Sequence, residues 1–391
     1  MFLTLAALTC LAAPAATPAN LTNTQAAFNP QPPPLNAKAY VLMDANSGAV
    51  LAQNNMNTRL EPASLTKLMT AYIASSALKQ NQIKLDDMVT ISEKAWRMEG
   101  SKMFVKVGAQ VSVKDLLDGI IIASGNDSSV ALAEHIAGTE DAFVQIMNET
   151  AARLGMQNTH FMDATGMPNP DHYTTAYDLA LLTRAIIKDF PEDYSRYKQQ
   201  WIVYNNIRQP NRNRLLWRDS SVDGLKTGHT EGAGYCLVTS ALRNGTRLIT
   251  VVLGESSDNG RTVDTQALLN WGYRFYETHQ LFEANQTIDE KQQPRVWFGK
   301  DKYAKLGFNK AAYVTIPVNQ YKQLKMTMTL NPKINAPLVK GQTYGTVTVT
   351  LNGQPLTTFP VVALEDNPKG NIISQGWDHI AILFSKWFRG V

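Results

Sequence analysis

The chain has 391 residues, 44% of them hydrophobic and 18% charged, which is enough for two or more domains with packed cores. Its formal net charge of +4 is mild and no lysine- or arginine-rich run occurs, which argues against a nucleic-acid-binding protein. The six histidines lack the His-Glu-x-x-His spacing of zinc peptidases, so the sequence predicts neither a metal site nor a cofactor.

The N-terminal residues 1–19 are predicted to be an export signal, because Phe2–Ala13 is apolar and small residues after it offer cleavage sites. Residues 20–36 contain a proline-rich run and are predicted to be an extended lead-in. Cleavage would remove Cys10 and leave Cys236 alone, so the sequence predicts no disulfide framework.

Residues 37–282 are predicted to form a catalytic domain of the α+β class. Apolar runs between turn residues predict its strands, which are Tyr40–Asp44, Val50–Ala52, Tyr235–Ala241 and Arg247–Leu253. Asn244-Gly245 predicts a hairpin between the last two, and the opening pair is expected to lie beside them near Val238 and Val251. Helical segments fill residues 65–188, and a helix over 262–277 closes the domain.

The first chemical motif is Ser64-Leu-Thr-Lys67, one of three Ser-x-x-Lys matches in the chain. Pro62 precedes it and apolar residues follow with helical spacing, so it lies on a helix that packs into a core. Residues three apart on a helix share one face, which places Lys67 beside the Ser64 hydroxyl. The matches at Ser76 and Ser195 lie in solvated segments. We therefore predict that Ser64 is the nucleophile.

Lys67 is the candidate base for that nucleophile. A lysine accepts no proton at neutral pH unless burial or a neighbouring cation lowers its pKa. Lys226, in the third motif, is the expected cation. Lys67 would then be neutral often enough to take the proton of the Ser64 hydroxyl.

The second motif, Ser124-Gly-Asn126, follows the very apolar stretch Leu116–Ala123 and precedes a predicted helix over Asp127–Ala137. By itself the triplet fits a tight turn in which Ser124 or Asn126 caps that helix. Its position between the other motifs favours chemistry. Ser124 would pass a proton to the leaving nitrogen, and Asn126 would bond the substrate amide or Lys67.

The third motif, Lys226-Thr-Gly-His-Thr230, is the most specific of the three and begins a predicted antiparallel strand. Gly228 would leave room for a substrate backbone beside the strand. Thr227, His229 and Thr230 add hydrogen-bonding groups in one place. The alternative is a glycine-rich turn with an exposed lysine.

Residues 283–370 carry threonine- and valine-rich runs with glycine and proline turns, which predict a small β-sandwich that serves as a spacer. In residues 371–391 the apolar side chains recur with helical spacing, at Ile373, Trp377, Ile380, Phe384, Trp387 and Phe388. This helix either packs on its own protein or lies on a membrane surface, and its two tryptophans favour the membrane surface. Charged residues and Gly376 interrupt the roughly 20 apolar residues that a membrane span needs.

The three motifs, in this order, are the signature of class A β-lactamases and penicillin-binding proteins. From about Ala37 onward the chain resembles the low-molecular-mass penicillin-binding proteins that act as D-alanyl-D-alanine carboxypeptidases. Further stretches carry the resemblance, namely Val222–Lys226, Asn211–Asn213, Leu215–Trp217, Tyr173–Asp178 and Trp271–Glu277. It implies a penicillin-binding/β-lactamase-like fold, in which helices cover both faces of an antiparallel sheet beside a helical subdomain, followed by the β-sandwich and an amphipathic helix.

The resemblance also implies a reaction and a set of site residues. The enzyme would remove the terminal D-alanine from peptidoglycan stem peptides through an acyl-enzyme, and β-lactams would inhibit it covalently. The backbone N–H groups of Ser64 and His229 would form the oxyanion hole. The substrate carboxylate would be held by Lys226, Thr227, Thr230 and Arg261, with Arg212 nearby. The protein would be exported to the periplasm and lie at the outer face of the cytoplasmic membrane, bound through its C-terminal helix.

Two other functions stay open from the sequence. A β-lactamase needs a base for fast deacylation, and no glutamate lies between Phe161 and Asp178, where such a loop would be. A non-catalytic cell-wall-binding scaffold could keep the β-sandwich and the tail, but the intact motifs argue against it. Measuring D-alanine release and penicillin hydrolysis on one sample separates all three.

Overall fold

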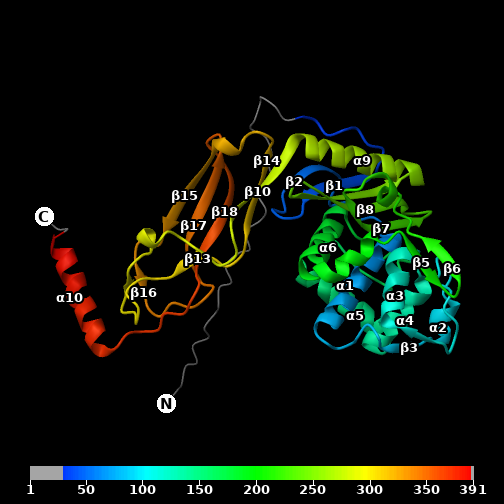
Figure 1. Cartoon of the computed structure of the whole chain (residues 1–391), viewed down its shortest axis with the longest axis horizontal. Helices are drawn as coiled ribbons and strands as arrows, with labels where there is room; N and C mark the ends of the chain where they lie inside the picture. Colours follow the sequence, from blue (N-terminus) through cyan, green and yellow to red (C-terminus); the bar gives the residue numbers. More distant parts are fainter. Residues whose placement is uncertain (1–29, 389–391) are drawn as a thin grey trace, which may run out of the picture. The chain divides into compact units, whose positions relative to one another are not determined.

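The computed structural model describes residues 30–388, which divide into two compact units (Figure 1). The first unit holds residues 30–286 and 308–322, and the second holds 287–307 and 323–388. The predicted export signal and most of the predicted lead-in lie outside the described residues. The predicted domain boundary at residue 282 stays a prediction, and in the structure the segment 308–322 packs with the first unit.

The first unit is built on a five-stranded antiparallel sheet. Its strands, in spatial order, are β2 (Val50–Asn54), β1 (Ala39–Asp44), β9 (Thr246–Glu255), β8 (Gly234–Arg243) and β7 (Val222–Thr230). The predicted hairpin turn is present, since Asn244 and Gly245 both have the positive φ that a two-residue turn requires. β1 pairs with β9, with Val41 opposite Val251. The expected pairing near Val238 is wrong, because β7 and β9 occupy both edges of β8.

Both faces of this sheet are buried, and successive residues of β1 alternate between them. Val41 and Met43 belong to the larger core, whereas Tyr40 and Leu42 belong to a smaller core under helix α9. In Figure 1, α9 covers one face of the sheet and α6 lies on the other, with α1 to α5 beyond it. The helices are α1 (Lys67–Lys79), α2 (Glu93–Arg97), α3 (Val113–Asp118), α4 (Asn126–Ala137), α5 (Glu140–Arg153), α6 (Ala176–Asp189), α7 (Pro191–Tyr194), α8 (Leu215–Arg218) and α9 (Asp258–Phe275).

Three small strand pairs complete the first unit. They are β3 (Met88–Thr90) with β4 (Gln110–Ser112), β5 (Trp201–Tyr204) with β6 (Ile207–Pro210), and β10 (Tyr276–Phe282) with β14 (Ala312–Pro317). The predicted closing helix starts four residues earlier than expected, where the Ser257 hydroxyl accepts the N–H of Gly260 at 2.9 Å. It ends at Phe275 because the chain continues directly into β10.

The second unit carries the all-β character that its composition predicts. Its main sheet has the order β11 (Gln286–Thr287), β13 (Leu306–Phe308), β18 (Gln354–Ala363), β17 (Thr343–Leu351) and β15 (Leu324–Leu330). The strands β12 (Val296–Trp297) and β16 (Ile334–Asn335) form a separate two-stranded parallel sheet in the same unit. Asn352 and Gly353 have positive φ and turn β17 into β18.

Helix α10 (Ile372–Phe388) follows this β unit and is tied to it by one buried acid. The Asp378 carboxylate accepts hydrogen bonds from Arg295 and from the backbone N–H of Phe298, each at 2.6 Å. Ile373 and Trp377 are 74% and 68% exposed, so apolar side chains of the helix face solvent. Within residues 30–388, no helix has the length and apolar character needed to cross a membrane.

Candidate active site

Ser64 lies in a tight 3₁₀ turn, Ala63–Thr66, that leads directly into α1. Lys67 opens the helix and is 1% exposed, whereas Ser64 is half-buried. The Lys67 Nζ donates a hydrogen bond to Ser64 Oγ at 3.1 Å and another to the carbonyl oxygen of Thr165 at 2.6 Å. The structure therefore brings together the nucleophile and the base that the motif spacing predicts.

The environment of Lys67 favours the neutral amine. Burial lowers the pKa of the Lys67 ammonium to about 7, with the carboxylate of Asp163 acting in the opposite direction and the guanidinium of Arg212 adding to the decrease. The sequence suggested Lys226 as the cation responsible. The structure shows that burial is the main cause and that Arg212 is the cation. A substantial fraction of Lys67 is thus able to accept a proton at neutral pH.

The second and third motifs meet through Ser124 and Lys226. Ser124 has a φ of +61° at the end of a π-helical turn, a left-handed backbone conformation that is rare for non-glycine residues. Lys226, on β7, donates to Ser124 Oγ at 2.8 Å and to the carbonyl of Thr227 at 3.0 Å. Burial, then the charges of Lys67 and Arg212, hold the pKa of Lys226 well below its usual value.

The side chain of Asn126 does not make the expected hydrogen bond to Lys67. Its side-chain amide donates to the carbonyl oxygen of Glu99 at 2.6 Å, so in the described structure it is turned to the loop between α2 and β4 and not to Lys67. The capping expectation is also wrong, because the residue at the N-cap of α4 is Gly125, without a side-chain cap. A bond from Asn126 to the substrate amide remains a prediction.

Strand β7 lies at one end of the sheet and packs against the Ser64 turn. Gly228 permits this approach, since a Cβ there would be 3.0 Å from the carbonyl oxygen of Pro62 and 3.3 Å from the Cβ of Ala63. The glycine was predicted to make room for a substrate, and in the structure it makes room for the nucleophile turn. Thr227 beside it is buried.

The last two residues of the third motif are less buried than the first three. His229 is exposed and stacks on Tyr235 with ring centroids 4.0 Å apart. Thr230 Oγ1 donates to the carboxylate of Glu61 at 3.1 Å. Glu61 was not singled out from the sequence, although it lies three residues before Ser64.

The two predicted arginines occupy different positions. Arg261 is buried, and its guanidinium donates to the carbonyls of Gly228 at 3.0 Å and Cys236 at 3.2 Å and pairs with Asp258. It therefore braces β7 against β8, and its contact with a substrate carboxylate remains a prediction. Arg212 is exposed and close enough to lower the pKa of both motif lysines.

Sequence reasoning missed the segment that covers Lys67, residues 163–166. Asp163, Thr165 and His172 lie about a hundred residues beyond the first motif, and only the fold brings them to it. A local signal existed, because Asp-x-Thr-Gly is typical of a turn closed by an aspartate side chain. Nothing in that pattern indicates which helix the turn would cover.

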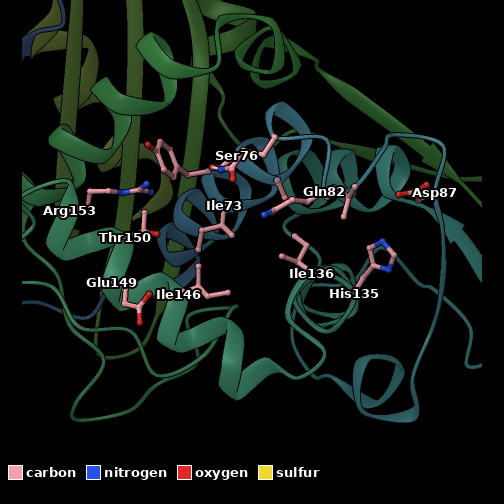
Figure 2. A pocket seen from close by; sticks show the side chains of 14 residues that line it. Ile73, Ser76, Gln82, Asp87, His135, Ile136, Ile146, Glu149, Thr150 and Arg153 are labelled. Atoms are coloured by element: carbon pink, nitrogen blue, oxygen red, sulfur yellow. Dashed lines mark hydrogen bonds between the residues drawn. The ribbon is translucent and has the colours of Figure 1, made fainter.

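A cavity of about 650 Å³ lies away from the three motifs, among α1, α4 and α5 (Figure 2). Ile73, Ile136 and Ile146 line it together with polar side chains such as Arg153. It also contains Ser76, the second Ser-x-x-Lys serine, whose hydroxyl accepts from Gln80 at 2.8 Å. Lys79 donates instead to the carbonyl of Asp189 at 2.9 Å, so this match does not form a nucleophile–base pair.

Comparison with known proteins points the same way as this geometry. The D-alanyl-D-alanine carboxypeptidase family matches residues 26–257, and the penicillin-binding protein 5 C-terminal domain matches residues 276–369. The chain is 45% identical over 364 residues to D-alanyl-D-alanine carboxypeptidase DacC of Escherichia coli (strain K12), covering 91% of this chain and 90% of that protein.

Solved structures agree with the sequence relatives. Penicillin-binding protein 5 from Haemophilus influenzae superposes with a TM-score of 0.82 at 43% identity, covering 87% of this chain and 99% of that one. Penicillin-binding protein D2 from Listeria monocytogenes, in its ampicillin-bound form, gives 0.58 at 30% identity over 62% of this chain and all of that one (100%). With Ser64, Lys67 and the Lys-Thr-Gly strand brought together, the chain belongs to the peptidase S11 family of D-alanyl-D-alanine carboxypeptidases, the low-molecular-mass penicillin-binding proteins.

Proposed function

We propose that the protein is a serine-type carboxypeptidase that removes the terminal D-alanine from peptidoglycan stem peptides. The observation that carries this proposal is the buried Lys67, whose Nζ lies 3.1 Å from Ser64 Oγ and whose pKa is lowered to about 7. Such a pair is a hydroxyl with its base already in hydrogen-bond contact. The family relationship supplies the peptide class, and the site supplies the chemistry.

In the acylation step, Ser64 Oγ attacks the carbonyl carbon between the last two D-alanines while Lys67 accepts the hydroxyl proton. The backbone N–H groups of Ser64 and His229 hold the oxyanion. The C–N bond then breaks, and the leaving nitrogen takes a proton from the Ser124 hydroxyl. Lys226, at 2.8 Å from that hydroxyl, orients it, and the proton that Lys67 took from Ser64 replaces the one that Ser124 gave up. Water finally hydrolyses the Ser64 ester and releases the shortened peptide.

A free terminal carboxylate distinguishes this substrate from an internal peptide bond. The Arg212 guanidinium gives the site positive potential, and Lys226, whose pKa is lowered by burial and by neighbouring cations, regains its proton more readily beside an anionic carboxylate. The hydroxyls of Thr227 and Thr230 are the proposed direct hydrogen-bond partners of the carboxylate. Arg261, buried beside β7, is proposed to attract it electrostatically. Asn126 is proposed to bond the substrate amide. An acyl donor without a terminal anion would be bound poorly.

β-Lactams are proposed to acylate Ser64 and to leave slowly. The relative from Listeria monocytogenes has been solved in ampicillin-bound form, which supports recognition of this drug class. Asp163 is the carboxylate nearest Lys67 in the 161–178 segment, and its oxygens already accept from Thr165 and Gly166 and face His172. Hydrogen bonds from its own turn hold the pKa of Asp163 below its ordinary value, which makes this carboxylate a weak base for water and disfavours a β-lactamase.

The test is a timed assay of one purified sample against a pentapeptide ending in D-alanyl-D-alanine and against benzylpenicillin. We expect catalytic D-alanine release, together with stoichiometric and long-lived labelling by penicillin. Rapid turnover of penicillin without D-alanine release would identify a β-lactamase. Neither reaction, in a protein with a cooperative thermal transition, would identify a non-catalytic scaffold.

We also propose that the enzyme is exported and lies at the outer face of the cytoplasmic membrane, held there by α10. The predicted signal over residues 1–19 supports export. Exposed Ile372, Ile373 and Trp377 support contact of the helix with lipid, since this apolar surface is otherwise in water. Asp378 is used for attachment to the β unit, which leaves the apolar side chains free for the membrane.

The proposed contact of α10 with lipid gives a direct prediction. Ile373→Glu combined with Trp377→Glu should abolish sedimentation with phosphatidylglycerol-containing vesicles, because both charged side chains would enter the lipid interface. Turnover of a soluble pentapeptide should stay within about twofold, since the three motifs lie in the other compact unit. The matched control is Met326→Glu with Val339→Glu, two exposed apolar residues of the same unit. Equal sedimentation of both double variants and wild type would refute the anchor.

A further inference from the structure

We propose that Asp163 and His172 are a pair of positioning residues that fix the carbonyl oxygen of Thr165 on Lys67 and so direct the lone pair of the neutral amine at the Ser64 hydroxyl. This inference rests on the proposed function, since it assigns a role toward the general base. It concerns side chains that the three motifs do not contain.

The partner of Lys67 is the first step of the argument. In the described structure Nζ has two hydrogen-bond partners, Ser64 Oγ at 3.1 Å and Thr165 O at 2.6 Å. A carbonyl oxygen only accepts, so it must bind an N–H of the amine and never its lone pair. The Ser64 hydroxyl is then the donor that the lone pair meets. A displaced carbonyl would allow the amine to rotate away from the nucleophile.

Asp163 is what shapes the backbone at Thr165. One carboxylate oxygen accepts the N–H groups of Thr165 and Gly166, each at 2.6 Å, and also the Thr165 hydroxyl at 2.7 Å. Gly166 has a φ of +94°, and a Cβ there would lie 1.8 Å from the carbonyl oxygen of Ala63. The turn therefore passes against the residue just before Ser64, with no room for a side chain at position 166.

His172 joins this turn to the nucleophile segment. It is 1% exposed, with Nε2 at 3.0 Å from the hydroxyl of Thr66, the residue next to Lys67. Its Nδ1 has no hydrogen-bond partner within the usual limits and lies 3.5 Å from the second carboxylate oxygen of Asp163. The buried ring therefore faces the Asp163 carboxylate with one nitrogen and the Thr66 hydroxyl with the other. His172 thus spans from Asp163 to the start of α1.

The anion at Asp163 also acts on the base directly. Burial alone would raise the pKa of Asp163, but the nearby His172 ring and the hydrogen bonds from Gly166 and Thr165 outweigh it and hold the pKa below its ordinary value. The charged groups facing Lys67 are Asp163 and Asp127, which raise its pKa, and Arg212, which lowers it; Lys226 is a further cation nearby. Loss of the Asp163 charge therefore lowers the pKa of Lys67.

The neighbouring residue Ala164 is held independently of Asp163. Its carbonyl accepts from Thr70 at 2.7 Å and its N–H donates to Glu140 at 3.0 Å. The segment therefore stays attached to α1 and α5 when the side chain of Asp163 is changed. Variants at this position are expected to fold, with a local change at Thr165.

The experiment measures the acylation rate by fluorescent penicillin from pH 5 to 9. Asp163→Asn keeps an oxygen for the two N–H groups but removes the charge. Its plateau should stay within about threefold of wild type, while the midpoint of the profile moves to lower pH by roughly half a unit or more. Asp163→Ala should lower the plateau roughly ten- to hundredfold, because the base is misplaced.

Further arms of the experiment separate positioning from general damage. His172→Ala should lower the plateau roughly tenfold, and combining it with Asp163→Ala should add little, as expected for residues that act as a unit. Asp171→Asn, an exposed acid of the same segment, is the charge-matched control and should behave as wild type. Wild-type rates and midpoints for both Asp163 variants would overturn the proposal. A wild-type protein that penicillin does not label would instead overturn the proposed function.

Discussion

Ser64→Ala is expected to abolish both D-alanine release and covalent labelling by penicillin. The only hydroxyl among the described hydrogen-bond partners of Lys67 is that of Ser64, so no other side chain is placed to become the acyl carrier. Removal of a nucleophile that works in a unit with its base costs on the order of 10⁶ in rate. The measurements are gel fluorescence after incubation with labelled penicillin and a coupled assay of D-alanine.

The other two Ser-x-x-Lys matches give the controls. Ser76→Ala removes a hydroxyl that is bonded to Gln80 in a separate cavity, and Ser195→Ala lies in a short 3₁₀ turn after α7. Both variants should retain labelling and turnover within about twofold. Labelling of the Ser64 variant at the wild-type stoichiometry would show that another residue is the nucleophile.

Lys67→Ala is expected to lower the acylation rate by roughly 10²–10⁴, the usual contribution of a positioned base. Wild-type acylation should rise with pH through about 7, where burial places the pKa of Lys67, and the variant should lose this rise. The sign follows from the chemistry, because only the neutral amine accepts the Ser64 proton. The readout is the second-order rate constant for penicillin between pH 5 and 9.

Lys79→Ala is the matched control for that change, since Lys79 is the lysine of the second match and donates to a backbone carbonyl. It should leave the profile unchanged. Thermal unfolding should show that the Lys67 variant remains folded, because the substitution removes a buried amine whose burial costs free energy. An acylation rate in Lys67→Ala equal to that of wild type would exclude the base role.

Local rules of the chain predicted the parts of the site that are themselves local. The Ser64–Lys67 pair follows from helical spacing, and the Asn244-Gly245 turn follows from two residues that tolerate positive φ. The all-β second unit follows from its composition. Each of these depends on residues a few positions apart, so the sequence contains the information directly.

The parts that escaped prediction depend on which segments meet in space. The cover of Lys67 by residue 165, nearly a hundred positions away, is decided by how the 163–166 turn packs on α1. The partner of Asn126 is a backbone carbonyl, and because every residue has one, the sequence does not indicate which residue supplies it. The strand order was partly wrong for a similar reason, since only the pairing of β7 with β8 excludes β1 from that edge.

The two buried lysines of the site also have a thermodynamic consequence. Lys67 and Lys226 are nearly inaccessible to water, and Arg212 adds a third basic group beside them. Burial lowers the pKa of both amines, so folding at neutral pH must either remove their protons or retain them with little water, and both courses cost free energy of folding. A bound carboxylate favours the protonated amines, and its binding energy is added to the free energy of unfolding. Occupancy by a carboxylate therefore strengthens the fold around Ser64.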